Sequence, residues 1–355
     1  MAAVQLWRRF SRLAACEGPP IGPIAAAMRR LLFAAVIFLA IGPVAGTHQR
    51  FQDTDLKSQV ITAKRLRHQA DGTGMLRFVE GWRLASRNSM FGGFSALAIP
   101  APGRFRLVSD GGYLAQLTLS DEGRVSDASI ALLPTPDGKA RRKSQSDVEA
   151  MTVDPATGKS WVALEWLNEI WRLDVAMTRV EARRTLPAPA WPKNRGPEAM
   201  VRLADGRFLI FSEDADDDPR GREALLYGGD PTRPGKPPLR FFYDSEGKGL
   251  VSDAAPLPDG GVLLVHRRLG LSPVFTTILA VVDPAKIRAG GVIRSQRIGR
   301  VPGALAENYE GAAVVTEKGR TFVWLVADDN FNSWQRSLLV KFELVDLPDS
   351  KKAAR

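Results

Sequence analysis

Five turn glycines, Gly103, Gly158, Gly206, Gly260 and Gly319, are flanked by acidic residues at nearly constant distances. Seven to nine positions before each glycine stands a small or acidic residue, namely Ser95, Glu149, Glu198, Asp253 or Glu310. Seven to nine positions after it stands Asp110, Glu165, Glu213, Arg267 or Asp328. Carboxylates that gather in one place repel one another, and a cation relieves that repulsion. Because hard oxygen ligands favour Ca²⁺ over Zn²⁺, the pattern predicts a Ca²⁺ site.

The two sets of acids converge if each turn joins the two strands of a hairpin. The start of the first strand and the end of the second then lie at the same end of the hairpin. The predicted metal ligands are Asp110, Glu149, Glu198, Glu213, Asp253 and Glu310. The alternative is that these acids accept backbone N–H bonds and hold the repeat together. The sequence leaves both roles open.

Arginines accompany the acids, and guanidinium groups bind phosphate bidentately. Arg267 and Arg268 stand where other units carry an acid, and Arg336 follows the Asp328-Asp329-Asn330 run. We predict that these three arginines bind phosphate while metal-bound carboxylates activate water. The predicted catalytic residues are Glu310, Asp328 and Asp329. The alternative role for the arginines is to pair with the neighbouring acids.

Other chemistries find little support in the sequence. Histidine occurs only at positions 48, 68 and 266, and there is no G-x-S-x-G nucleophile elbow. H-E-x-x-H, P-loop and dinucleotide-binding motifs are also absent from the sequence. The basic run at 139–143 carries no interleaved aromatic residues, so nucleic-acid binding is not predicted.

The elements that position these residues are short strands. Apolar runs at 105–108, 161–164, 208–211, 262–265 and 322–326 follow the turns, and a third run follows each of them. Repeats of about 50 residues with three or four strands are typical of propeller blades. We therefore predict an all-β fold, a β-propeller of five blades with six possible. The last unit lacks one strand, so residues 75–84 are predicted to pair with 338–344 and close the ring.

The N-terminal region has the features of an exported protein. Residues 28–46 read as a signal peptide, with Arg29-Arg30, an apolar run and small residues before Thr47. The predicted organisation is an over-extended start at 1–27, this signal peptide, a linker or disordered segment at 47–74, the propeller domain at 75–345, and a disordered tail at 346–355. The only cysteine, Cys16, precedes the cleavage site. We expect a periplasmic or secreted protein with no membrane insertion after cleavage.

Several stretches resemble the bacterial "esterase-like activity of phytase" family. They include Phe91-Gly92-Gly93-Phe94-Ser95-Ala96-Leu97, Gly196-Pro197-Glu198-Ala199, Glu307-Asn308-Tyr309-Glu310-Gly311, Ala327-Asp328-Asp329-Asn330-Phe331 and 335–344. The resemblance implies an exported propeller that hydrolyses phosphoesters of a small substrate with Ca²⁺. The chain departs from the family at His266, where glutamate is common, and at Ala327, where serine is usual.

The alternative function is a non-catalytic propeller of the cell envelope that binds a ligand or a protein. Aromatic residues in or near the predicted loops favour it, namely Trp166, Trp191, Tyr309, Phe331 and Trp334. Such a module would need neither a metal nor an open coordination position. The sequence leaves the substrate, the number of metal ions and the oligomeric state open.

Overall fold

The computed structural model describes residues 59–67, 71–139, 145–187, 191–193, 195–213, 218–332 and 334–348. The chain divides into two compact units, 1–48 and 49–355, and all described residues belong to the second. They form strands and two 3₁₀ turns, η2 (Pro284–Lys286) and η3 (Gly303–Leu305), without an α-helix. Within this part of the chain no helix is long and apolar enough to span a bilayer. The predicted signal peptide and the segment before it lie outside the described residues.

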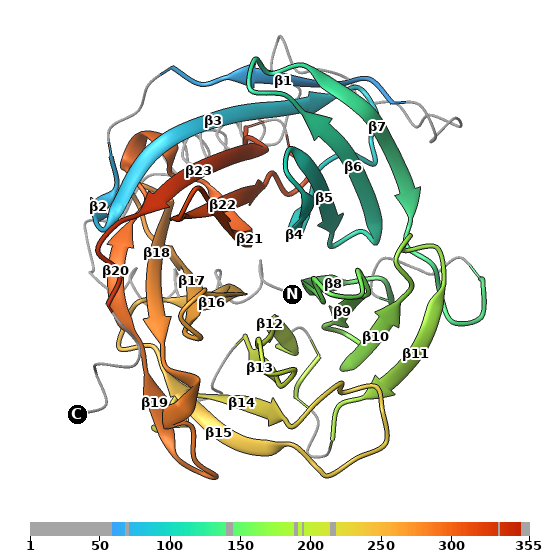
Figure 1. Cartoon of the computed structure of the whole chain (residues 1–355), viewed down its shortest axis with the longest axis vertical. Helices are drawn as coiled ribbons and strands as arrows, with labels where there is room; N and C mark the ends of the chain where they lie inside the picture. Colours follow the sequence, from blue (N-terminus) through green and yellow to red (C-terminus); the bar gives the residue numbers. More distant parts are fainter. Residues whose placement is uncertain are drawn as a thin grey trace, which may run out of the picture. The chain divides into compact units, whose positions relative to one another are not determined.

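The strands form five sheets arranged as the blades of a β-propeller, as predicted (Figure 1). Blade 1 contains β4 (Phe94–Ala101), β5 (Arg104–Ser109), β6 (Tyr113–Leu119) and β7 (Val125–Leu132). Blade 2 contains β8 (Val148–Val153), β9 (Ser160–Leu164), β10 (Glu169–Leu173) and β11 (Val180–Thr185). Blade 3 contains β12 (Pro197–Arg202), β13 (Phe208–Ser212), β14 (Arg222–Tyr227), β15 (Leu239–Asp244) and β19 (Val292–Arg294).

Blades 4 and 5 complete the ring. Blade 4 contains β16 (Leu250–Pro256), β17 (Val262–Leu269), β18 (Phe275–Val282), β20 (Gln296–Arg300) and β2 (Thr73–Gly74). Blade 5 contains β21 (Asn308–Glu317), β22 (Arg320–Asp328), β23 (Leu338–Leu344), β3 (Leu76–Ser86) and β1 (Ile61–Arg65). The first strand of each blade is the innermost one, and Figure 1 shows β4, β8, β12, β16 and β21 around the centre.

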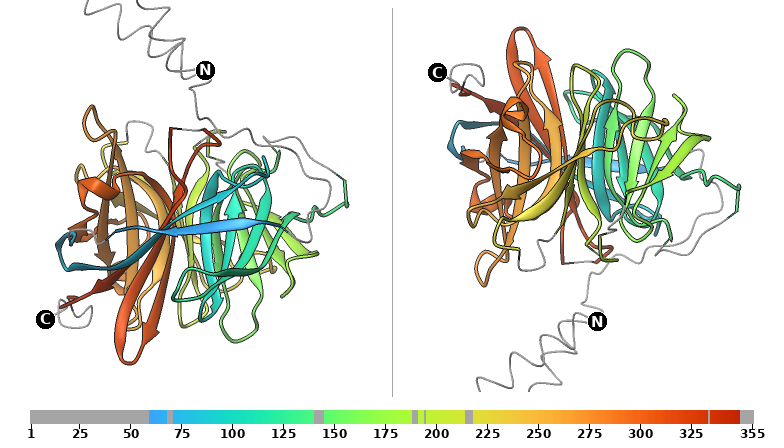
Figure 2. Two further views of the ribbon diagram at one scale, coloured as in Figure 1. Left: turned by 90° about the horizontal axis from the view of Figure 1, so that it is seen from above. Right: turned by 90° about the horizontal axis from the view of Figure 1, so that it is seen from below.

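The N-terminal strand closes the ring, as predicted from the missing strand of the last unit. β3 pairs antiparallel with β23, from Leu338 opposite Arg83 to Leu344 opposite Leu76. β1 then covers the outer edge of β3, and the N–H of Gln59, just before β1, donates to the carbonyl of Ala128 in β7 at 3.0 Å. Figure 2 shows β1 crossing the side of the ring. Blade 5 is thereby linked to blade 1 on its outer side.

Two strands lie where the sequence predicts a linker at 47–74. β1 has only one buried apolar residue, Ile61, and β2 is a two-residue pairing with both residues exposed. The alternation of apolar and polar residues in β1 extends only over residues 61–64, and β2 is too short to show one. Both segments form strands because each pairs with another strand, β1 with β3 and β2 with β20.

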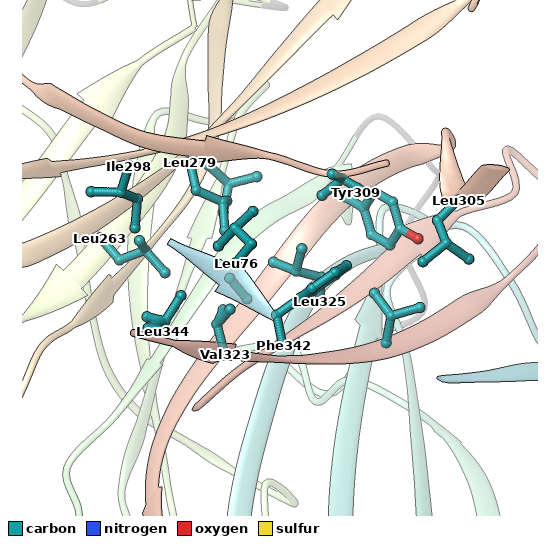
Figure 3. Packing of buried hydrophobic residues seen from close by; sticks show 14 of the residues in the cluster. Leu76, Leu263, Leu279, Ile298, Leu305, Tyr309, Val323, Leu325, Phe342 and Leu344 are labelled. Carbon is teal, nitrogen blue, oxygen red and sulfur yellow. The ribbon is translucent and has the colours of Figure 1, made fainter. Parts of the chain in front are cut away.

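The core consists of apolar layers between neighbouring blades. Between blades 4 and 5, Leu263 and Leu279 of one sheet face Val323 and Phe342 of the other, with Leu76 of the closing strand between them (Figure 3). β9 and β13 are buried along their whole length, which explains their uninterrupted apolar sequences. Each fully buried Leu or Val side chain contributes about 1.5–3 kcal/mol. This packing fixes the inner strands that carry the site.

Candidate metal-binding site

Each innermost strand carries a β-bulge at the same position. The register shifts fall at Ser95 in β4, Glu149 in β8, Glu198 in β12, Ser252 in β16 and Glu310 in β21. A bulge adds an unpaired residue and redirects its side chain. The five bulges therefore place one serine or glutamate per blade at the same end of the inner strands.

In blade 4 the bulge residue is Ser252, whereas the sequence spacing predicts Asp253 at this position. The carboxylate of Asp253 is buried and accepts two backbone N–H bonds, from Ala254 at 2.8 Å and from Ala312 of blade 5 at 2.6 Å. Its contacts are those of a residue that joins blades 4 and 5. The prediction was misaligned by one residue because it allowed the offset to the turn glycine to vary.

The two bulge serines also join neighbouring blades. The Ser252 hydroxyl donates to the carbonyl of Tyr309, which precedes the bulge of blade 5, at 3.0 Å. The Ser95 hydroxyl donates in the same way to Val148, which precedes the bulge of blade 2. Only three of the five bulges thus carry an acid, in blades 2, 3 and 5.

The second strands end beside these bulges, as the hairpin geometry predicts. The backbone N–H groups of Asp110, Glu165 and Glu213 each donate to a backbone carbonyl at 2.9 to 3.1 Å. The accepting residue is the one two positions before the bulge of the same blade. Arg267 and Asp328 occupy the matching places opposite Leu250 and Asn308. The strand ends therefore supply four acids and one arginine to the same end of the ring as the bulge acids.

Arg267 is the cation at the centre of the acids from blades 3 and 5. Its guanidinium pairs with Glu310 and lies 3.5 Å from Glu213 and 3.7 Å from Glu198. It also donates to the Asn308 amide oxygen at 3.2 Å. Although burial lowers the pKa of Arg267, these acids raise it by more, so the arginine stays charged. Three carboxylates from two blades therefore share one internal counter-ion.

Glu310 and Asp328 form a coupled pair of acids beside this arginine. Asn308 donates from its amide to Glu310 at 2.8 Å and to Asp328 at 3.2 Å. Burial, followed by the charge of Glu310, raises the pKa of Asp328 to about 8. The Asn308 amide therefore links the two carboxyl groups, and Asp328 holds a proton at neutral pH.

Blade 2 carries a second group of acids, which lies outside the ion pairs that Arg267 makes with Glu198, Glu213 and Glu310. Asp147, Glu149 and Glu165 each offer a carboxylate oxygen within 4.8 Å of the others. Burial, followed by the charge of Glu198, raises the pKa of Glu149 well above its usual value. Burial, followed by Glu213, raises the pKa of Glu165 to about 8. We call Asp147, Glu149 and Glu165 the blade 2 triad.

The blade 2 triad fits a hard divalent cation. Oxygens that coordinate one Ca²⁺ at 2.3–2.6 Å lie at most about 5 Å apart, and the triad meets this limit. All three donors are carboxylates, the ligand type that Ca²⁺ prefers. The sequence spacing does not predict Asp147 as a metal ligand. It identifies Glu165 as one of the recurring acids but not as a ligand. The signal for Asp147 is its position two residues before the bulge, where its carbonyl accepts the Glu165 N–H at 2.9 Å.

Residues 89–331 match the family model of phytase-like proteins, described as esterase-like activity of phytase. The chain belongs to the phytase-like family. The resemblance found in the sequence is therefore confirmed over most of the propeller. No curated protein matched the chain in sequence.

Among solved structures, this phytase-like propeller is similar to the glutaminyl cyclase of Myxococcus xanthus, with 13% identity and a TM-score of 0.46 over 76% of this chain and 97% of the other. It is also similar to an α-L-arabinofuranosidase of Podospora anserina, with 12% identity and a TM-score of 0.46 over 70% and 91%. The Malassezia sympodialis allergen Mala s 1 matches with 13% identity and a TM-score of 0.42 over 81% and 95%.

In the phytase-like propeller, Asp329 fixes the conformation of the loop that follows β22. Its carboxylate accepts from the backbone N–H of Gly93 and of Phe331, both at 3.0 Å, and from the Ser337 hydroxyl at 2.9 Å. These bonds hold Phe331 at φ 52°, next to Asn330 at φ 47°. A non-glycine residue in this left-handed region costs roughly 1–2 kcal/mol, so the loop depends on these contacts. Asp329, predicted as catalytic, has the contacts of a positioning residue.

The other two predicted phosphate ligands do not contact the acid group. Arg268 is exposed, and neighbouring residues of a strand point to opposite faces of the sheet. Arg336 pairs with Glu307 and approaches the Ala304 carbonyl at 3.5 Å, beside η3. Of the three arginines, only Arg267 contacts the acids that the sequence predicts.

His266 lies inside the propeller wall. Its Nε2 is 2.6 Å from the Tyr243 hydroxyl, and its Nδ1 is 3.3 Å from the Ile278 carbonyl. Burial lowers the pKa of His266 to about 3, so the ring is neutral at physiological pH. His266 and Ala327, where the chain departs from its family, occupy equivalent positions, each one residue before the strand-end residue Arg267 or Asp328.

Proposed function

We propose that this phytase-like propeller is a metal-dependent phosphoester hydrolase that uses Ca²⁺. The observation that carries the proposal is the blade 2 triad, whose three carboxylate oxygens lie within one coordination sphere. The acids of blades 3 and 5 already have Arg267 as a counter-ion. A divalent cation held by Asp147, Glu149 and Glu165 would relieve the repulsion among these three carboxylates.

In the proposed mechanism the chain supplies charge neutralisation and a proton. A bound Ca²⁺ would add positive charge for the phosphate and lower the pKa of water. Arg267 offsets the charge of Glu198, Glu213 and Glu310, so that a phosphate anion can approach this end of the ring. Asp328, with a pKa of about 8, holds a proton at neutral pH that it can donate to the leaving oxygen. The attacking water releases a second proton, which Glu310 can accept, so that the pair of acids regains the proton that Asp328 gave to the leaving oxygen.

The second candidate function is a non-catalytic binding propeller of the cell envelope. Trp334 supports it, because this large side chain is 64% exposed in the loop that follows β22, at the same end of the ring as the acids. Exposed tryptophans are enriched at binding surfaces. A metal would then stabilise the propeller without supporting catalysis.

We also propose that the protein is exported to the periplasm or secreted. The support is the predicted signal peptide at 28–46, which lies outside the described residues. Mass spectrometry of the mature protein should then show an N-terminus near Thr47. An intact 28–46 segment in a cytoplasmic product would contradict this proposal.

The function is tested by metal analysis and by a phosphatase assay on the same purified protein. We expect bound Ca²⁺ and hydrolysis of 4-nitrophenyl phosphate that stops with chelator and returns with Ca²⁺. Glu149→Gln should lose both properties, because it removes a ligand while keeping side-chain size. The matched control is Glu122→Gln, which alters an exposed acid of the β6–β7 turn and should keep both. A protein that binds Ca²⁺ in the expected way and hydrolyses no phosphoester would favour the binding propeller.

A further inference from the structure

A cavity of about 1000 Å³ opens between blades 1 and 2, next to the acid group. Its inner end is lined by Gly111, Gly112, Ser146 and Phe331. Gly111 directly follows Asp110, and Ser146 directly precedes Asp147. The cavity therefore begins beside the acids of the proposed metal site. We call it the blade 1–2 groove, and its volume is that of a pocket for a small organic molecule.

The walls of the groove are mainly apolar. Tyr113, Leu132, Pro134, Pro136 and Phe331 supply most of the side-chain surface. Leu132 is 57% exposed, which is unusual for a leucine at the end of a strand and leaves apolar surface uncovered. An apolar wall of this kind gains free energy when an apolar group covers it.

Two cations line the groove among the residues described, Lys139 and Arg179. Arg179 is 72% exposed and lies 3.8 Å from Glu181, so part of its charge is already offset. The apolar wall of the groove suits a ligand whose part beyond the anionic group is apolar.

Phe331 stands where the groove meets the acids. A Cβ on Gly93 would lie 2.2 Å from the Phe331 ring and 2.7 Å from Asp110 Oδ1, so only glycine fits between them. The ring is therefore held close to Asp110, while its backbone is fixed by Asp329 as described above. An aromatic ring held rigidly at this place can stack on a planar group without losing side-chain entropy.

We propose that the blade 1–2 groove binds the organic part of the ester, and that Phe331 selects esters of aromatic or bulky apolar alcohols. The inference rests on the proposed function, because that function places the phosphate at the acid group. The substrate class is then a phosphate ester with one anionic end and an apolar leaving group. A small polyphosphorylated sugar lacks the apolar surface that the groove would cover.

The test compares binding of 1-naphthyl phosphate, 1-naphthol and inorganic phosphate by calorimetry in the presence of Ca²⁺. We expect Phe331→Ala to weaken 1-naphthyl phosphate about tenfold and to leave inorganic phosphate unchanged. Leu132→Glu, which alters an exposed residue of the groove, should have the same effect. Melting temperatures of both variants show whether the fold is kept.

Two controls alter similar side chains outside the groove. Phe242→Ala truncates a half-buried phenylalanine of β15 in blade 3, and Leu271→Glu charges a fully exposed leucine of the β17–β18 loop. Both should bind all three compounds as the wild type does. Equal weakening in the groove variants and in these controls would overturn the role of the groove.

The outcomes separate this inference from the proposed function. If the wild type binds 1-naphthol and Phe331→Ala does not, the groove is supported. This holds even if neither 1-naphthyl phosphate nor inorganic phosphate binds. That result would contradict the proposed phosphate site but not the groove. If wild type binds inorganic phosphate and 1-naphthyl phosphate equally well, or binds neither naphthyl compound, the groove inference is wrong.

Discussion

The acids of blades 3 and 5 and the acids of blade 2 lie at the same end of one ring but are neutralised differently. Glu198, Glu213 and Glu310 share the guanidinium of Arg267. The blade 2 triad lies outside these ion pairs, and its three carboxylate oxygens lie within 4.8 Å of one another. We propose that a cation from solution neutralises this second region, whereas Arg267 neutralises the first.

The origin of the difference is a single repeat position. The strand-end residue is acidic in blades 1, 2, 3 and 5, and it is Arg267 in blade 4. Because an arginine is long, it reaches acids from the blades on both sides of its own. Blade 2 lies farther round the ring, and among the described residues the ion pairs of Arg267 do not extend to Glu149 or Glu165. Substitutions in the two regions should therefore change the free energy of unfolding and the binding of Ca²⁺ in different ways.

Replacing Arg267 should have the largest effect on stability. Arg267→Met leaves three largely buried acids without their cation, and breaking such a buried pair costs about 3–5 kcal/mol. Urea unfolding with chelator present measures the loss. The control is Arg294→Met, whose arginine is 60% exposed and pairs with Asp244, so its loss should stay below about 1 kcal/mol. Equal losses in the two variants would contradict the role of Arg267.

Glu149→Gln should abolish stabilisation by Ca²⁺. A ligand at one hundred times its Kd stabilises the folded state by about 2.7 kcal/mol, and the variant should lose this increment. Without Ca²⁺ the variant should be at least as stable as wild type, because one repelling charge is gone. Thermal unfolding with Ca²⁺ and with chelator measures both effects. Should the variant keep the full Ca²⁺ increment, Glu149 is not a ligand.

Asp253→Ala should destabilise the propeller to the same extent with and without Ca²⁺. The change leaves the buried N–H groups of Ala254 and Ala312 without acceptors, which costs about 1–3 kcal/mol. Denaturant unfolding in both conditions measures the loss. A loss that appears only with Ca²⁺ would instead support the original prediction that Asp253 is a metal ligand.

The smallest effect is expected for a change of one pH unit in the absence of metal. Glu165 has a pKa of about 8 in the folded state and near 4.5 when unfolded, so only the folded state holds its proton between these values. Stability should therefore fall as pH rises through this window, by about 1.4 kcal/mol per pH unit for one such group. Ca²⁺ affinity should rise over the same range, because metal binding needs ionised carboxylates. Unfolding of Glu165→Gln, which should show a shallower slope, checks the assignment.

The repeat and its closure could be predicted from the sequence because they depend on local signals. Turn glycines and apolar runs mark each hairpin, and the missing strand of the last unit identifies β3 as its partner. The hairpins also bring Glu310 and Asp328 to one end of the ring. The local pattern marks β1 only weakly, because it alternates over just four residues, 61–64, and its partner β3 is itself placed by ring closure.

The details of the site depend on register and on side-chain reach. A bulge shifts the register by one residue, so the spacing could not distinguish Ser252 from Asp253. Asp147 precedes its strand and is brought to the triad only by the pairing of β8 with β9. Arg336 resembles a phosphate ligand in the sequence, yet Glu307 pairs with it in the structure. The sequence shows which charges are present, and the fold determines which of them meet.

Titration calorimetry of Ca²⁺ into matched variants tests the central contrast most directly. Glu149 and Glu198 occupy equivalent bulges, one in the blade 2 triad and the other beside Arg267. We predict one Ca²⁺ per wild-type chain, no binding to Glu149→Gln, and one Ca²⁺ still bound by Glu198→Gln. A wild type that binds no Ca²⁺, or equal loss of binding in both variants, would contradict the assignment of the metal site to blade 2.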